Sequence, residues 1–340
     1  MEIHRPDQEV VRGSGIASVT YMNRGHALME RIRVPEIEGH ALSSMAFIAT
    51  DGKGSWTVGE GDNWSEAIGL WSGTFIKTEK EAGKKSGKKE GTEKLVLHDA
   101  VRPGGGANLM LMRRTYEHLP SGEGSPEQYR MTLDVSTDLG SSWNLVMKRG
   151  YTRRSTDEAQ DLFPVREDHG LPDPERAPEA SQFDFLIGHF EATHWLKQPQ
   201  RELRWTADAT AVHALNGHGI LEFNWNDKDP SLPDAATSIL RVYNRAMRQW
   251  ESLYLTNRSN VPLYFGGVQE GERIVLHPFG AQTSSRALSQ WIFFNMEKDS
   301  YQWKGLRAAH RGVELQPTWT IDFARREVEI PAKPSLDSRD

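Results

Sequence analysis

The chain has 340 residues and a net charge of −6, from 41 lysines and arginines against 47 aspartates and glutamates. This acidic balance excludes a broadly basic nucleic-acid-binding protein, and zero cysteines exclude disulfides, thiolate catalysis, cysteine-type zinc sites and iron–sulfur clusters. No apolar run approaches the ~18 residues of a membrane-spanning helix, and the charged first residues contain no signal-peptide core. We therefore expect a cytoplasmic protein with no nucleic-acid or membrane partner.

The first half, residues 1–153, reads as one domain of short β-strands. Its runs are rich in β-branched and aromatic residues, and turn residues separate them at spacings of about 8–15 residues, as in an antiparallel meander. The runs are SSMAFIAT (43–50), GSWTVGE (54–60), IGLWSGTFIKT (68–78), KLVLHDAV (94–101), NLMLMRRTY (108–116), YRMTLDVST (129–137) and WNLVMKRGYTR (143–153). Residues 77–94 are rich in Lys, Gly and Glu, which predicts a solvated hairpin loop; a cationic arm for an acidic partner is the alternative.

A linker is predicted over residues 154–182, which carry four prolines and many acidic residues. The second domain then spans 183–330, and residues 331–340 form a tail. Strand-like runs continue through this half: TSILRVY (237–243), WESLYLT (250–256), VPLYFGG (261–267), RIVLHPF (273–279) and QWIFFNMEKDSYQWKG (290–305). The fold class that we predict is all-β, with two tandem antiparallel β-barrels.

The two halves resemble each other, which indicates a diverged tandem duplication. Short motifs around some of the histidines and tryptophans of the first half recur in the second. The separation between matched motifs falls only where a polar loop interrupts the first half, as loop insertions between fixed strands would produce. The matched residues are His26 with His218, Trp56 with Trp250, Asn63 with Asn257, Gly73 with Gly267, His98 with His277, and Trp143 with Trp303. Chance similarity of short β-segments is the alternative.

The opening of the second domain, FDFLIGHF, carries a family resemblance. Phe183, Asp184, Phe185, Gly188 and Phe190 resemble the first residues of a calycin-type, lipocalin-like β-barrel family of largely unknown function. The resemblance covers roughly residues 183–325 and departs where His-Phe replaces the common Glu-Trp pair. It implies that the opening aromatic residues plug the barrel floor, that the glycine lets the first strand bend, and that the barrel encloses a cavity for a small, mostly apolar molecule. The first half lacks this opening, so its first strand is abbreviated or supplied by residues 9–12.

Strong catalytic or metal motifs are absent from the sequence. The run GGG at 104–106 lies between two strand-like runs without a following helix, so we interpret it as a turn and not as a phosphate-binding loop. His189 and His194 are five residues apart, which on a strand puts them on opposite faces and argues against paired metal ligands. We predict no metal and no cofactor.

Histidines on predicted strands are the first candidates for chemistry. His218 and His277 belong to repeat-matched pairs with His26 and His98. A neutral imidazole suits a general base near pH 7 and is also a haem ligand. The alternative is a structural histidine kept in both copies by common descent.

The strand from 250 to 256 offers two opposite faces. By its period of two, Trp250, Ser252, Tyr254 and Thr256 share one face, while Glu251, Leu253 and Leu255 share the other. If the tryptophan face points inward, the cavity is aromatic with hydroxyl groups. If the other face does, Glu251 is an inward carboxylate with a raised pKa that suits acid–base chemistry. The sequence leaves both open.

The function predicted first is a cofactor-free lyase, isomerase, hydratase or cyclase that acts on a hydrophobic or aromatic small molecule in a barrel cavity. There, positioning and one acid–base pair suffice. The predicted catalytic residues are His218, His277, Tyr254, Glu251 and Arg241. The predicted ligand-binding residues are Trp250, Tyr243, Asn257, Trp291 and Phe265.

Two other functions stay open at this point. One is a non-catalytic carrier of a hydrophobic ligand or haem, and the other is a structural module whose barrels are filled by side chains. A homodimer is compatible with each of them.

Overall fold

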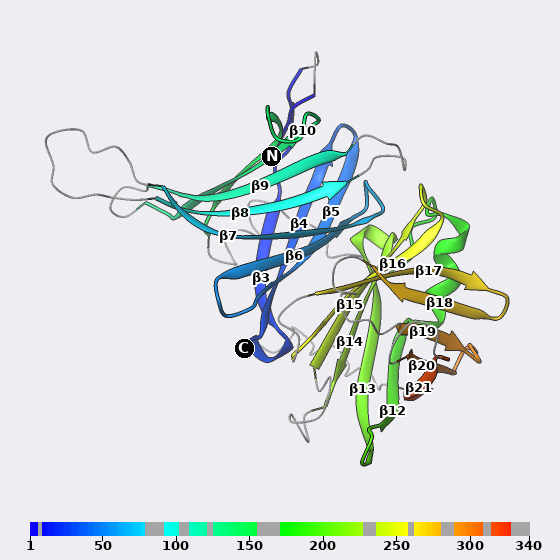
Figure 1. The fold of residues 1–340 in the computed structure, drawn as a ribbon. Coiled ribbons are helices and arrows are strands. Elements are labelled where there is room, and N and C mark those ends of the chain that lie inside the picture. Colours follow the sequence, from blue (N-terminus) through cyan, green and yellow to red (C-terminus); the bar gives the residue numbers. More distant parts are fainter. Residues whose placement is uncertain are drawn as a thin grey trace, which may run out of the picture.

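A computed structural model shows two all-β antiparallel units in tandem, which confirms the predicted fold class. Figure 1 shows the first unit, coloured from blue through cyan to dark green, beside the second, which runs from bright green to red. The structure describes residues 1–5, 9–78, 92–101, 109–120, 125–154, 171–226, 236–257, 262–279, 289–308 and 314–327. The glycine run 104–106, the tail 331–340, and most of the Lys-rich loop and of the linker lie outside these residues.

The first unit is a curled sheet of eleven antiparallel strands in the order β2-β1-β11-β10-β9-β8-β7-β6-β5-β4-β3. A 3-10 turn, η1 (Asn23–Gly25), joins β3 to β4. The strands are β1 (Glu2–Ile3), β2 (Val11–Arg12), β3 (Ile16–Met22), β4 (Ala27–Ile37), β5 (His40–Thr50), β6 (Ser55–Asp62), β7 (Ile68–Thr78), β8 (Thr92–Val101), β9 (Met110–Leu119), β10 (Gln128–Ser136) and β11 (Asn144–Thr152).

The second unit is a closed barrel of ten antiparallel strands in sequence order. Two 3-10 segments belong to it: η3 (Pro178–Leu186) before the first strand and η4 (Leu215–Gly217) between β13 and β14. The strands are β12 (Gly188–Lys197), β13 (Glu202–Ala214), β14 (Gly219–Trp225), β15 (Ala236–Asn244), β16 (Gln249–Thr256), β17 (Leu263–Glu270), β18 (Arg273–Pro278), β19 (Ser289–Phe294), β20 (Ser300–Arg307) and β21 (Gln316–Arg325).

Strand length explains why one unit closes and the other does not. In the barrel, the ten-residue β12 pairs with both β13 and β21 and so joins the two ends of the sheet. In the first unit, the two-residue β1 pairs with β11 and with the equally short β2. Among the described residues β3 pairs with β4 alone, so the sheet ends there. Of the two expected alternatives, the structure shows an abbreviated first strand, and the short β2 falls within residues 9–12.

The strand register supports the predicted internal repeat. Trp56 lies opposite Gly73 and Gly73 opposite Leu97, while Trp250 lies opposite Gly267 and Gly267 opposite Leu276. A Cβ at either glycine would stand 1.8 Å from a carbonyl oxygen of the next strand, so the close approach requires glycine in both units.

One proposed match is wrong. Trp143 comes directly before β11, whereas Trp303 lies in β20, whose counterpart by strand order is β10. Tryptophan is a poor marker of register where the turn lengths of the two copies differ.

The floor of the barrel is plugged by η3, as the family resemblance implies. Phe183 is fully buried and packs edge-on against Trp250 at 4.8 Å and Phe293 at 5.0 Å between ring centroids. Ala177 and Ala180, which we predicted as linker, are buried in the same cluster. The described end of the predicted linker is therefore part of the barrel.

The two units pack against each other through matching strands. The outer faces of β4 and β5 and of β14, β15 and β16 share one apolar cluster, in which Phe47, Leu240 and Leu253 are fully buried. Gly59 of β6 allows close approach, because a Cβ there would stand 2.3 Å from Leu253. Each unit also places a 3-10 turn against the other: η1 contacts β15 and η4 contacts β5. The interface therefore has an approximate two-fold relation within one chain.

Candidate functional site

A cavity of about 720 Å³ lies inside the closed barrel. Its volume is within the range of small-molecule sites, and most of its wall is apolar or aromatic. The ring-bearing and aliphatic residues of the wall are Ile239, Tyr254, Leu263, Phe265, Trp291, Phe293, Trp303, Trp319, Ile321 and Phe323. The polar residues include Glu222, Asn224, Arg241 and His194.

The strand β16 turns its tryptophan face inward, which settles the alternative that the sequence left open. Tyr254 and Thr256 line the cavity. Glu251 points the other way, toward the first unit, where its Oε2 accepts a hydrogen bond from the Ile68 backbone N–H at 2.7 Å. Its Oε1 accepts a second bond from Asn244 Nδ2 at 2.9 Å. Glu251 is therefore a buried interface residue and cannot act in the cavity.

Three predicted residues form one aromatic wall. Trp291 and Phe265 are stacked with centroids 3.7 Å apart, and Tyr254 meets Trp291 edge-on at 4.9 Å. They come from the successive strands β16 and β17 and from β19. All three line the cavity.

An ion pair is buried in the cavity wall. The guanidinium of Arg241, 1% exposed, donates a hydrogen bond to Glu222 Oε2. It lies between the rings of Phe183 and Phe293, at 5.3 and 5.5 Å from their centroids. Asn224 Nδ2 donates to the other oxygen of Glu222 at 2.8 Å. Arg241 was a predicted site residue, but its partner Glu222 was missed.

His194, on β12, is buried and lines the cavity. Its ring is stacked on Trp205 at 4.6 Å, and Trp319 Nε1 donates a hydrogen bond to its Nδ1 at 3.2 Å. Burial lowers the pKa of His194 to about 3. The imidazole is therefore neutral at pH 7, with its proton assigned to Nε2 by the bond at Nδ1, and it is a weak base.

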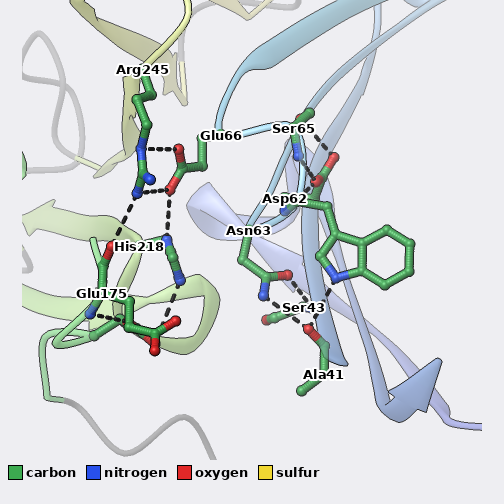
Figure 2. A network of polar contacts seen from close by, with 11 residues as sticks. Ala41, Ser43, Asp62, Asn63, Ser65, Glu66, Glu175, His218 and Arg245 are labelled. Carbon is green, nitrogen blue, oxygen red and sulfur yellow. Dashed lines mark hydrogen bonds and ion pairs between the residues drawn. The ribbon is translucent and has the colours of Figure 1, made fainter. Parts of the chain in front are cut away.

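His218 and His277 lie outside the cavity, so the prediction that either is its base is wrong. His218 follows η4 at the junction of the units, where Nδ1 is 2.9 Å from Glu66 Oε1 and Nε2 is 3.5 Å from Asp173 Oδ2. Figure 2 shows Arg245 joining the same Glu66. His277 is exposed on β18 opposite Gly266, as His98 is on β8 opposite Ser72. Histidines kept at equivalent positions of the two copies are here surface or interface residues.

Trp250, Tyr243 and Asn257 also lie apart from the cavity wall. Trp250 and Tyr243 are buried beneath it, and Trp250 Nε1 donates to Gln182 Oε1 at 3.1 Å in the floor plug. Asn257 Oδ1 accepts from the Ala236 backbone N–H at 3.3 Å. Asn63 makes the equivalent bond with Ser43 at 2.7 Å, visible in Figure 2. This asparagine ties together the ends of two strands in each unit.

Inside the curl of the first unit lies a cluster of charges. Glu60 accepts hydrogen bonds from Arg114 and from Ser44 Oγ, the latter at 2.7 Å, and Arg149 Nη1 is 3.9 Å from its Oε1. Burial alone would raise the pKa of Glu60, but the charges of Arg114 and Arg149 outweigh it and lower that pKa to about 2. Burial raises the pKa of the neighbouring Glu30, and the charge of Glu60 adds to this effect.

Metal ligands do not gather anywhere in the part of the chain that the structure describes: no three His, Asp or Glu residues there could hold an ion. Within the same residues, no helix is both long enough and apolar enough to span a membrane.

Comparisons with known proteins assign no family. No protein-family model matches the chain, and neither does any curated protein. Among solved structures, the chain is similar to a protein of unknown function from the DUF3598 family of Nostoc punctiforme. The similarity has a TM-score of 0.27 and 8% sequence identity, and it covers 84% of this chain and 89% of that chain.

Proposed function

We propose that the second barrel binds a small, mainly aromatic molecule in its cavity. The observation that carries the proposal is the cavity itself: about 720 Å³, walled by stacked aromatic rings and containing a buried polar group, Arg241 with Glu222. Sites for small molecules combine such an apolar wall with a few placed polar groups. A barrel filled by its own side chains would not keep this volume.

Binding is favoured over catalysis because, among the described residues of the cavity wall, no carboxylate or imidazole is free to act as a base. Of the residues predicted to exchange protons, His218, His277 and Glu251 lie elsewhere. His194 is held neutral by burial, and Glu222 is committed to Arg241 and Asn224. The carrier function is therefore preferred to the lyase or isomerase function. The cytoplasmic location and the homodimer stay predictions.

A fluorescent titration tests the proposal. N-phenyl-1-naphthylamine is an uncharged aromatic probe whose emission rises in dry apolar sites. We expect one equivalent to bind to the full chain, because the cavity is larger than the probe and its wall is mostly apolar. The matched variant is Ile239→Trp combined with Leu263→Trp. These residues flank Tyr254 across three paired strands, so two larger rings would occupy the cavity from both sides.

The control for this variant is Val268→Trp, an equal enlargement at an exposed position of β17. The cavity variant should weaken probe binding by about tenfold or more, while the control binds as the original chain does. Circular dichroism confirms that both variants fold. Absence of probe binding to the original chain, or equal binding by all three proteins, would contradict the proposal.

A further inference from the structure

We propose that the ligand of the barrel is an uncharged planar aromatic molecule that carries both a hydrogen-bond acceptor and a hydrogen-bond donor, as an aryl amide or lactam does. This inference rests on the proposed binding function and names the chemical class of the ligand. It follows from three properties of the cavity wall: its charge balance, its unpaired polar atoms and its aromatic rings.

The buried charges of the wall cancel. Arg241 is 1% exposed and Glu222 4% exposed, and the two form one ion pair. A charged ligand that entered this region would lose its hydration without gaining a free opposite charge. Lys197 and Arg307 also line the cavity but are exposed to solvent. An ion pair with either of them would contribute only about 0–1 kcal/mol.

Three buried polar atoms of the wall have no hydrogen-bond partner among the described residues. They are Arg241 Nε and His194 Nε2, which are donors, and Asn224 Oδ1, which is an acceptor. The rest of each side chain is fixed, because Glu222 holds Arg241 and Asn224 while Trp319 holds His194. An unpaired buried polar atom is costly. A ligand with an acceptor and a donor would satisfy groups of both kinds, which a hydrocarbon cannot do.

Other parts of the same wall are flat rings. Phe265 and Trp291 are stacked 3.7 Å apart, and Trp303 meets Trp319 at 89° with centroids 5.8 Å apart. Rings prefer offset-stacked or edge-to-face contact with other rings, so a planar aromatic ligand fits this lining better than a flexible chain. The same argument disfavours a fatty acid, which is both charged and flexible.

A series of three probes with one ring system tests the inference: naphthalene, 1-naphthoate and 1-naphthamide. Their dissociation constants are measured on the full chain by displacement of N-phenyl-1-naphthylamine. We expect 1-naphthamide to bind about tenfold or more tightly than either of the others, which corresponds to one or two hydrogen bonds to buried groups. Naphthalene binding that equals amide binding, or tightest binding of the naphthoate, would overturn the inference and leave the binding function standing. If no probe binds, both fail.

Two variants test which groups of the cavity wall cause the preference for 1-naphthamide over naphthalene. Asn224→Leu removes the acceptor, and His194→Phe removes a donor while keeping the stacked ring. Each should bring the affinity for 1-naphthamide to within about threefold of that for naphthalene, without weakening naphthalene binding. Gln269→Leu, at a position exposed on β17, is the control and should keep the full preference. A preference for the amide that survives in both cavity variants would contradict the assignment, and if one of them does not fold, the other still decides.

Discussion

The interiors of the two units differ although their strands are in the same register. In the first unit Glu30, Ala46 and Glu60 lie side by side across three strands. In the second, Glu222, Ile239 and Tyr254 occupy the equivalent row. Likewise Arg114 lies beside Leu97 where Trp291 lies beside Leu276. Glu60 and Arg114 of the first interior are thus replaced by aromatic rings in the second, while the carboxylate of Glu30 is matched by that of Glu222.

The two units therefore share a strand register while the side chains that fill their interiors differ. The residues that fix the register, such as the tryptophan–glycine pairs Trp56 with Gly73 and Trp250 with Gly267, are the same in both units. The inward positions are free to change, because any set that satisfies its own charges and hydrogen bonds keeps the fold. One interior can therefore hold an ion-pair network while the other holds a cavity.

The largest expected effect comes from breaking the charge cluster. Glu60→Leu should lower the free energy of unfolding by about 3–5 kcal/mol, since it leaves the buried Arg114 and Arg149 without their carboxylate. At the equivalent position of the second unit, Tyr254→Phe should cost about 1 kcal/mol or less, since only a hydroxyl is lost. Urea unfolding followed by circular dichroism compares the two. Equal losses would mean that the interiors do not differ in the way described.

The next effect concerns η1 and η4, the 3-10 turns that each pack against the other unit. Leu215 is fully buried against the first unit, and Leu215→Ala should cost about 2–5 kcal/mol through the cavity that it leaves. Its counterpart Asn23 donates to the Leu255 carbonyl at 3.1 Å and accepts from Ser238 Oγ at 2.8 Å. Asn23→Ala should cost about 1–3 kcal/mol by leaving those groups unpaired. A greater loss from Asn23→Ala in the same urea assay would reverse this ranking.

The smallest effect is the pH dependence of the first interior. The raised pKa of Glu30 means that the folded state favours its protonated form, so this residue lowers the stability as the pH rises above 4.5, the ordinary value, and the loss is complete above the raised pKa. Glu30→Gln should therefore stabilise the protein, more at pH 8 than at pH 4. Exposed Glu272→Gln is the control and should show no such difference. A stabilisation that is equal at both pH values would contradict this explanation.

The pKa shift of Glu60 has the opposite sign to that of Glu30, and so does its effect on stability. Its pKa is lowered to about 2, so its contribution to stability is present above pH 4.5, the ordinary value, and is lost as the pH falls toward 2. In Glu60→Leu, the acid destabilisation of the first unit between those values should shrink. Unfolding midpoints measured from pH 5 to pH 2.5 check this.

The strands could be predicted from their β-rich runs and turn residues, and the repeat from matched motifs. The floor plug was implied by the family resemblance alone. Of the predicted site residues, Tyr254, Phe265 and Trp291 lie in the aromatic wall. Sequence reasoning failed at the polar groups of the cavity for a physical reason. All nine residues of β15 are buried, since its outer face packs on the first unit. Both faces of β15, and most of β16, are buried, so alternation cannot show that Arg241 points into the barrel and Glu251 away from it. The sequence drew attention to His194 only as one of two histidines, His189 and His194, that we rejected as paired metal ligands.

Hydrogen–deuterium exchange with and without saturating 1-naphthamide tests the central claim most directly, because it reports on both units of the unmodified chain at once. The account predicts that the ligand slows exchange in β15, β16 and β19 to β21, which line the cavity, and leaves β4 to β11 unchanged. Protection confined to the first unit, or equal protection of both, would contradict the assignment of binding to the second barrel.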